Sequence, residues 1–76
     1  METLPVAGTV GAGVMILGNN LKSATSVSFN GTAATFTIVS NTEIKASVPA
    51  GATTGKVEVG TPTTTLRSNV SFRVIP

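Results

Sequence analysis

Few residues of this 76-residue chain could do acid–base, nucleophilic or redox chemistry. Histidine, cysteine, tyrosine and tryptophan are absent, and the carboxylates are Glu2, Glu43 and Glu58. Catalysis needs a nucleophile beside a base, or two carboxylates close together. The conceivable pairs are therefore a serine or threonine with a lysine, or Glu43 with Glu58, and no motif brings either pair together. The sequence predicts no catalytic residue, and hence a protein that is not an enzyme.

Ligands for metals and cofactors are missing in the same way. Zinc sites need cysteine or histidine, and calcium sites need several clustered oxygen ligands. Four glycines near the start (Gly8, Gly11, Gly13 and Gly18) resemble a phosphate loop. Such a loop passes its ligand to the N-terminus of a helix, and no helical periodicity follows here. We therefore predict no metal site and no cofactor-binding site.

The charged residues are scattered and nearly balanced. Five basic residues give a formal net charge of +2, and they stand singly, at Lys22, Lys45, Lys56, Arg67 and Arg73. Nucleic-acid binding needs basic residues gathered on one face or aromatic platforms among them, and neither pattern is present. No apolar stretch approaches the length of a membrane span. We expect no nucleic-acid partner and no insertion into a membrane.

The elements that position these residues are short apolar runs with a period of two, divided by glycine, proline and asparagine. This pattern predicts β-strands with one buried face, joined by tight turns. No window has helical periodicity, so we predict no helix and an all-β sandwich. The expected strands are Gly13–Leu17, Ser26–Asn30, Thr32–Val39, Glu43–Val48, Lys56–Val59 and a last strand with Val70, Phe72 and Val74.

Two local predictions follow from these strands. Asn30-Gly31 is typical of a two-residue hairpin loop with positive φ at both positions, and we expect it to join Val27–Phe29 to Thr35–Ile38. The inward phase of each strand predicts one buried cluster. Its expected members are Ile16, Val27, Phe29, Phe36, Ile44, Val48, Val57, Val59, Phe72 and Val74.

The order of the strands, and of the glycine, proline and asparagine residues between them, resembles the IPT/TIG domain, an immunoglobulin-like β-sandwich. The resemblance covers nearly the whole chain in order. It rests on Pro5 to Gly11 (PVAGTVG), Val14 to Leu21 (VMILGNNL), Val27 to Gly31 (VSFNG), Val48 to Gly55 (VPAGATTG) and the final Phe72-Arg73-Val74 strand. It implies a single domain over residues 1–76, cut from a longer multidomain chain, with no catalytic residues to carry over from the family.

The chain departs from the family pattern at two places. Only Glu2, Thr3 and Leu4 precede Pro5, so we expect the family's first strand to be short or missing. Met15 and Leu17 lie on the strand face opposite Val14 and Ile16, where threonine is common in the family. Exposed apolar pairs can mark a contact surface. Met15 and Leu17 are therefore the candidate interface, unless the N-terminal segment or loops cover them.

The family occurs in bacterial surface proteins, enzyme accessory domains, receptor ectodomains and transcription factors, so the fold alone determines no function. We expect a non-catalytic spacer or protein-contact module of an extracellular or cell-envelope protein, bacterial in origin. The alternative is an accessory domain of a secreted carbohydrate-active enzyme. Its partners would be neighbouring domains or another protein. A glycan partner is possible but unsupported, because exposed tryptophan and tyrosine are lacking.

A missing first strand would leave the neighbouring strand, Gly13–Leu17, as an open sheet edge. Open edges recruit strands from other chains. We therefore expect a monomer or weak dimer, with any self-association through this strand, by edge pairing or by the apolar contact of Met15 and Leu17.

Overall fold

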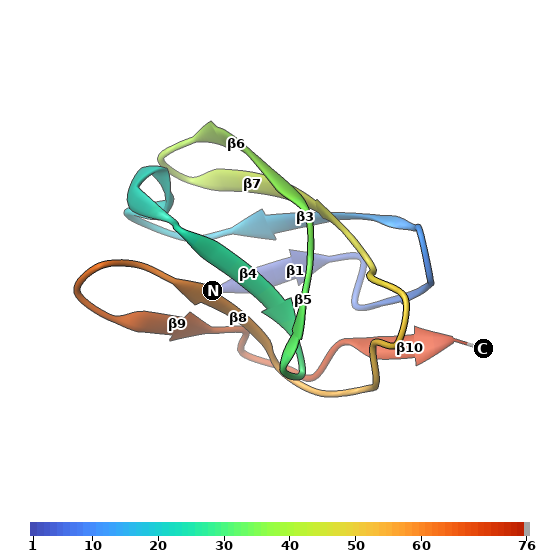
Figure 1. Cartoon of the computed structure of the whole chain (residues 1–76). Helices are drawn as coiled ribbons and strands as arrows, with labels where there is room; N and C mark the ends of the chain where they lie inside the picture. Colours follow the sequence, from blue (N-terminus) through green and yellow to red (C-terminus); the bar gives the residue numbers. More distant parts are fainter. Residues whose placement is uncertain (76) are drawn as a thin grey trace.

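The structure, a computed structural model, describes residues 1–75, in which two four-stranded sheets pack face to face (Figure 1). Sheet I has the order β1 (Glu2–Leu4), β3 (Gly13–Leu17), β7 (Glu43–Ser47), β6 (Phe36–Ser40). Sheet II has the order β5 (Thr32–Ala33), β4 (Ser26–Phe29), β8 (Val57–Gly60), β9 (Thr65–Arg67). Strand pairing within both sheets is antiparallel. The predicted all-β sandwich is confirmed.

A short parallel pair closes one end of the sandwich. It joins β2 (Ala7–Thr9) to β10 (Arg73–Ile75), beside the C-terminal end of the chain (Figure 1). Residues 1–75 contain no α-helix, as predicted, and their single helical element is a three-residue 3₁₀ turn, η1 (Leu21–Ser23). Leu21 on that turn is fully buried, and the predicted core omitted it.

The core lies between the inner faces of the two sheets. Strand alternation supplies it, because every second residue of β3, β7, β4 and β8 points inward. The rings of Phe29 and Phe72 meet edge to face, with centroids 5.2 Å apart. Phe36 and Val74 are only partly buried and pack against the cluster. The buried members are Val14, Ile16, Leu21, Val27, Phe29, Ile44, Ala46, Val48, Val57, Val59 and Phe72.

The strand predicted over Thr32–Val39 is divided between the two sheets. Asn30 and Gly31 have φ of 49° and 90°, which confirms the predicted positive φ in the two-residue loop. The loop returns only to β5, however, because the chain crosses to sheet I after Ala34 and continues there as β6, paired with β7. The predicted hairpin with Thr35–Ile38 is therefore wrong. Ala34 still donates its backbone N–H to the Val27 carbonyl, and the Thr35 carbonyl accepts from Ser47 on the other sheet.

The first strand is short but present. Glu2, Thr3 and Leu4 pair antiparallel with Leu17, Ile16 and Met15. β7 pairs with the whole of β3, and β1 pairs with Met15 to Leu17, so within residues 1–75 only Gly13 and Val14 of this strand lack a neighbouring strand on the β1 side. The expectation that Gly13–Leu17 forms an open edge is therefore wrong. Three residues suffice because the buried Thr3 side chain anchors the strand against the core.

The last predicted strand begins later than expected, and β9, which precedes it, was not predicted. β9 ends at Arg67 and β10 begins at Arg73, so Val70 lies outside both and is 53% exposed. Ser68 explains the gap between β9 and β10. Its buried hydroxyl accepts a hydrogen bond from the Val57 N–H at 3.0 Å and donates to the Val70 carbonyl at 2.7 Å. These bonds replace strand pairing and let residues 69–71 bulge outward.

Candidate contact surface

The outer face of sheet I carries the two residues that the sequence identified, Met15 and Leu17. The strand registers place them in two cross-strand rows. The first row, across β1, β3, β7 and β6, is Leu4, Met15, Lys45 and Thr37. The second row, across β1, β3 and β7, is Glu2, Leu17 and Glu43. The inward alternates on these strands are buried, so both rows face away from the core.

We call this surface the sheet I face. Met15 and Leu17 are half-buried, and Leu4, the cross-strand neighbour of Met15, is 50% exposed. A shallow hollow of about 200 Å³ lies beside them, lined by Leu4, Gly13, Val14, Met15, Lys45 and Ala46. Gly13 leaves the hollow open, since a Cβ there would meet no atom within 4 Å. The N-terminal segment thus adds Leu4 to this surface beside Met15.

The charged groups of the sheet I face have no salt-bridge partner within residues 1–75. Lys45 is exposed between Met15 and Thr37, and Glu43 follows Leu17 in the second row. The single ion pair among the described residues joins Arg67 Nε to Glu58 Oε2 at 2.7 Å, on the outer face of sheet II. The sheet I face therefore combines apolar side chains with unpaired charges of both signs.

The outer face of sheet II is different in kind. Its cross-strand neighbours are small or polar, and Glu58 and Arg67 satisfy each other. The members are Ser26, Ser28, Ala33, Glu58, Gly60, Thr65 and Arg67. This face offers no exposed apolar side chain larger than alanine among those residues.

The two carboxylates that could act as a catalytic pair are far apart. Glu43 projects from the outer face of sheet I and Glu58 from the outer face of sheet II, so the core separates them. Lys56 donates through Nζ to the Asn69 carbonyl at 2.7 Å, which is a structural contact. Within residues 1–75 no three histidine, cysteine, aspartate or glutamate side chains gather as a metal site would require. The glycine-rich start leads into β3 and not into a helix.

Asn30 has a structural role that the sequence did not reveal. Its side-chain amide donates to Thr53 Oγ1 at 2.8 Å and to the Thr54 carbonyl at 3.2 Å. The side chain lies over Gly55, where an added Cβ would overlap Asn30 Cγ. The Asn30-Gly31 loop and the 53–55 segment therefore depend on each other. In the sequence, these two segments can be found only as two glycine-containing motifs, VSFNG and VPAGATTG.

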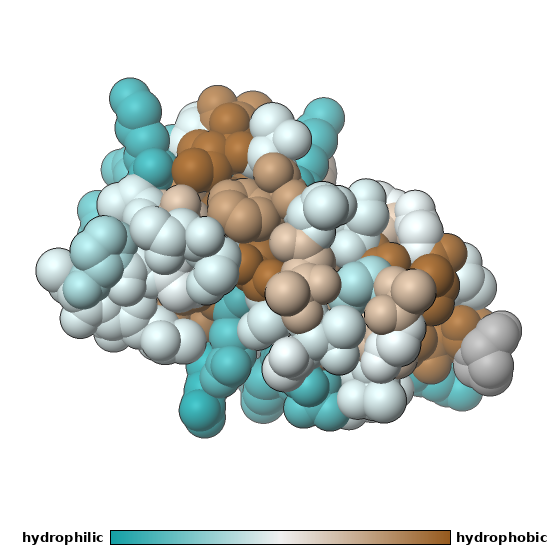
Figure 2. Space-filling model, viewed as in Figure 1, coloured by the Kyte–Doolittle hydropathy of each residue, from teal (hydrophilic) through white to brown (hydrophobic). Residues whose placement is uncertain are grey.

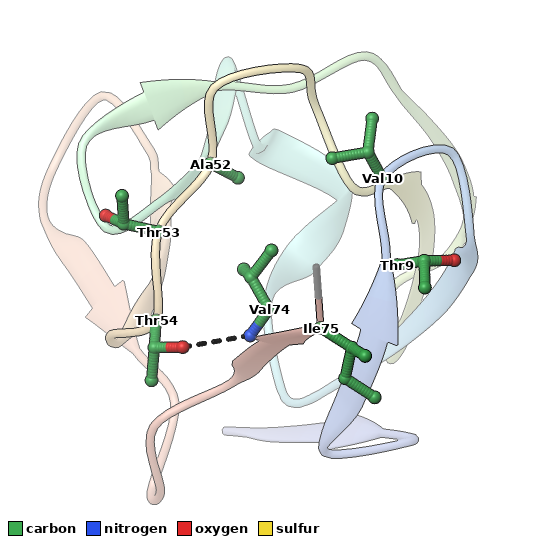
Figure 3. A pocket seen from close by; sticks show the side chains of 7 residues that line it. All are labelled: Thr9, Val10, Ala52, Thr53, Thr54, Val74 and Ile75. Atoms are coloured by element: carbon green, nitrogen blue, oxygen red, sulfur yellow. Dashed lines mark hydrogen bonds between the residues drawn. The ribbon is translucent and has the colours of Figure 1, made fainter.

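The largest hollow lies at the end of the sandwich where the chain leaves β10. It has a volume of about 590 Å³ and is lined by Thr9, Val10, Ala52, Thr53, Thr54, Val74 and Ile75. Val74 points into the opening, and its backbone N–H donates to Thr54 Oγ1 at 3.0 Å (Figure 3). Apolar atoms gather at this end in the space-filling view (Figure 2). Among residues 1–75, the side chains that line the hollow are not ionisable.

Comparison with known proteins gives a family and a fold. The model of the IPT/TIG domain matches residues 2–74. No curated protein matches the sequence. Among residues 1–75, no helix has the length and apolar character that crossing a membrane would require.

Two solved Bacteroides proteins contain a similar fold. A candidate phosphatase of Bacteroides thetaiotaomicron VPI-5482 superposes with a TM-score of 0.86 and 23% identity, over 99% of this chain and 17% of its own. An auxiliary nutrient binding protein of Bacteroides ovatus ATCC 8483 superposes with a TM-score of 0.85 and 22% identity, over 97% and 20%. The chain thus spans a fifth or less of each of these proteins, and the similarity establishes the fold alone.

Proposed function

This chain belongs to the IPT/TIG family of immunoglobulin-like domains, and we propose that it is a non-catalytic contact module of an extracellular or cell-envelope protein, bacterial in origin. The module contacts a neighbouring domain or another protein through the sheet I face. The observation that carries this proposal is the asymmetry of the two outer faces. Leu4, Met15 and Leu17 stand on one, and the other is small, polar and internally ion-paired.

The absence of a chemical site supports a contact role. Glu43 and Glu58 lie on opposite sides of the core, and the largest hollow is lined by threonine, valine, alanine and isoleucine. Enzyme pockets need a few convergent polar groups with tuned acidity inside an apolar cavity. Substrate chemistry on this domain would require groups that residues 1–75 do not bring together.

The two Bacteroides structures support the idea of a module within a longer chain. In each, a fold like this one makes up 17% or 20% of the protein. One of them is a nutrient binding protein, which favours a place among proteins of the cell envelope. Because a fold hosts many functions, the contact surface and not the fold carries the functional argument.

The proposal is tested by hydroxyl-radical footprinting with mass spectrometry, which measures the exposure of individual side chains. We compare this 76-residue domain with the full product of its natural gene, both at low micromolar concentration. Met15 and Leu17 should be oxidised several-fold more slowly in the full product, whereas exposed Pro62, in the β8–β9 loop, should react equally in both. The contact role of this face is refuted if Met15 and Leu17 react equally in the two samples, with and without the proteins that co-purify with the full product, and if they react no more slowly at about 1 mM than at low micromolar concentration.

A further inference from the structure

The two rows of the sheet I face have complementary residues on each of the two central strands. On β3 the pair is Met15 in the first row and Leu17 in the second. On β7 the pair is Lys45 in the first row and Glu43 in the second. Resting on the proposed contact role, we propose that the occupant of this face is a second copy of the chain, related by a twofold axis that crosses the strands between the two rows.

This axis places each row over the other row of the second copy. Met15 then meets Leu17 of the second copy, and Lys45 meets Glu43 of the second copy, each contact occurring twice. At the β1 edge the same axis brings Leu4 over the exposed Glu2 of the second copy. In a twofold contact, each residue on one side of the axis meets the residue at the same distance on the other side. A surface therefore suits such a contact when residues that attract each other lie at equal distances on the two sides of the axis. The rows are two residues apart along each strand, about 7 Å. The axis would pass midway between them.

Another face-to-face arrangement has the axis parallel to the strands, and it fails on charge. It brings each row over itself, so Lys45 can meet only Leu4, Met15, Thr37 or its own copy, and never a carboxylate. On the central strands, Lys45 and Glu43 would then be buried against apolar side chains or their own copies, which is unfavourable. The axis that crosses the strands pairs both of these charges and leaves a mismatch only at the edge, between Glu2 and Leu4. The positions of the charges therefore select the axis that crosses the strands.

The same charges disfavour a partner with a purely apolar surface. Such a partner would cover Met15 and Leu17 and strip water from Lys45 and Glu43, which have no salt-bridge partner within residues 1–75. Leaving a buried charge unpaired costs far more than an apolar contact gains. Packed sheets lie about 10 Å apart, a gap that the opposed lysine and glutamate side chains together can span.

The dimer should be weak because the face is small. Three strands of five residues and the three-residue β1, about 4.8 Å apart and with about 3.4 Å per residue, form a face of roughly 290 Å². Two such faces fall below the roughly 1,200 Å² of a stable interface. We expect a dissociation constant on the order of 0.1–1 mM, which suits modules held close together at a surface, where effective concentrations reach the millimolar range.

The test is sedimentation equilibrium of the 76-residue chain up to about 1 mM, with charge-exchange variants. Lys45→Glu and Glu43→Lys should each raise the dissociation constant about tenfold or more, because each creates a like-charge contact. The double variant Lys45→Glu/Glu43→Lys should return it to within about threefold of the wild type. The matched control Lys22→Glu/Glu43→Lys has the same formal net charge of +2 as the wild type but lacks the exchanged contact, and it should stay weak.

A second variant measures the apolar part of the contact. Met15→Thr/Leu17→Thr should abolish dimerisation while thermal unfolding still shows a folded domain; if this variant unfolds, Met15→Gln alone replaces it. The proposal is overturned if the wild type is monomeric at 1 mM, or if the exchanged double variant is no better than its control. Either result leaves the contact role open, since the low-micromolar footprinting comparison tests contacts with a neighbouring domain or with a different protein.

Discussion

The outer faces of the two sheets differ in what they leave available to a partner. On sheet II, Glu58 and Arg67 pair with each other across β8 and β9, and the neighbouring side chains are serine, threonine, alanine and glycine. On sheet I, Met15 and Leu17 stand on the central strand β3, with Lys45 and Glu43 unpaired beside them.

This difference distinguishes the apolar residues that folding requires from those that only a contact with a partner requires. Both sheets have inner faces of valine, isoleucine and phenylalanine, because a two-layer sandwich must bury one face of each sheet. An outer face is free to be polar, as on sheet II. An apolar outer face is unnecessary for folding, so its presence on sheet I alone points to a partner.

The sharpest test of this separation compares an inner with an outer apolar residue. Phe72 is 1% exposed and packs edge to face on Phe29. Phe72→Ala, or Phe29→Ala, should lower the free energy of unfolding by about 3–5 kcal/mol. Met15→Ala should lower it by less than about 1 kcal/mol. Urea titration measures both, and comparable losses would show that Met15 belongs to the core.

The next largest effect on stability is expected where the Asn30 side chain contacts the 53–55 segment. Gly55→Ala should cost about 1–3 kcal/mol, because its Cβ overlaps the Asn30 side chain. Asn30→Gly keeps the permitted positive φ and removes the overlapping atoms. The double variant should therefore be less destabilised than the sum of the two single variants, with a coupling of about 0.5–3 kcal/mol. Additive losses in a denaturant-based double-mutant cycle would contradict this contact.

β1 offers a stabilising substitution beneath the sheet I face. Thr3 is 2% exposed, and its hydroxyl has no hydrogen-bond partner among residues 1–75. Thr3→Val has nearly the same shape without the buried polar group, and we expect a gain of about 1 kcal/mol. Thr3→Ser is the control. It keeps the hydroxyl and loses the methyl group, and it should destabilise by about 1 kcal/mol. A destabilised Thr3→Val variant would mean that the hydroxyl is satisfied in solution.

The smallest expected effects compare one glycine on each outer face. Gly13, on sheet I, has open space where a Cβ would lie, so Gly13→Ala should stabilise the domain by about 0.4–1 kcal/mol. On sheet II, a Cβ at Gly60 would meet the Ser26 hydroxyl, which must rotate away. Gly60→Ala should therefore gain nothing until Ser26→Ala is added. Differential scanning calorimetry resolves such shifts, and equal gains at both sites would show that the outer faces are equally open.

Prediction from the sequence succeeded where the pattern is local. Alternation in Glu43–Val48 predicted the buried Ile44, Ala46 and Val48, and β3 begins and ends at the predicted residues. The predicted φ of Asn30 and Gly31 depends on two adjacent residues, and it is confirmed. It failed at the crossing after Ala34, because Ala34 before the crossing and Phe36 and Ile38 after it share the same inward phase. Alternation reports which face is buried and says nothing of which sheet the strand joins.

The candidate surface was predicted only in part. Met15 and Leu17 could be identified because β3 has apolar residues on both of its faces, which a period of two makes visible. Leu4, Lys45 and Glu43 joined them only through the registers of β1 and β7. Leu21 was missed because one buried residue on a single 3₁₀ turn leaves no periodic signal.

The sequence by itself determined the β-class, the main strands, most of the inward residues, the Asn30-Gly31 turn and the lack of catalytic residue types. Each of these depends on residue type and on spacings of a few positions, which act before any long-range contact forms. Tertiary structure alone decided the pairing of β1 with β3, the crossing of the chain from sheet II to sheet I, the overlap of Asn30 with Gly55 and the two rows of the sheet I face. These depend on which segments distant in sequence become neighbours, and that choice follows from burying both inner faces at once.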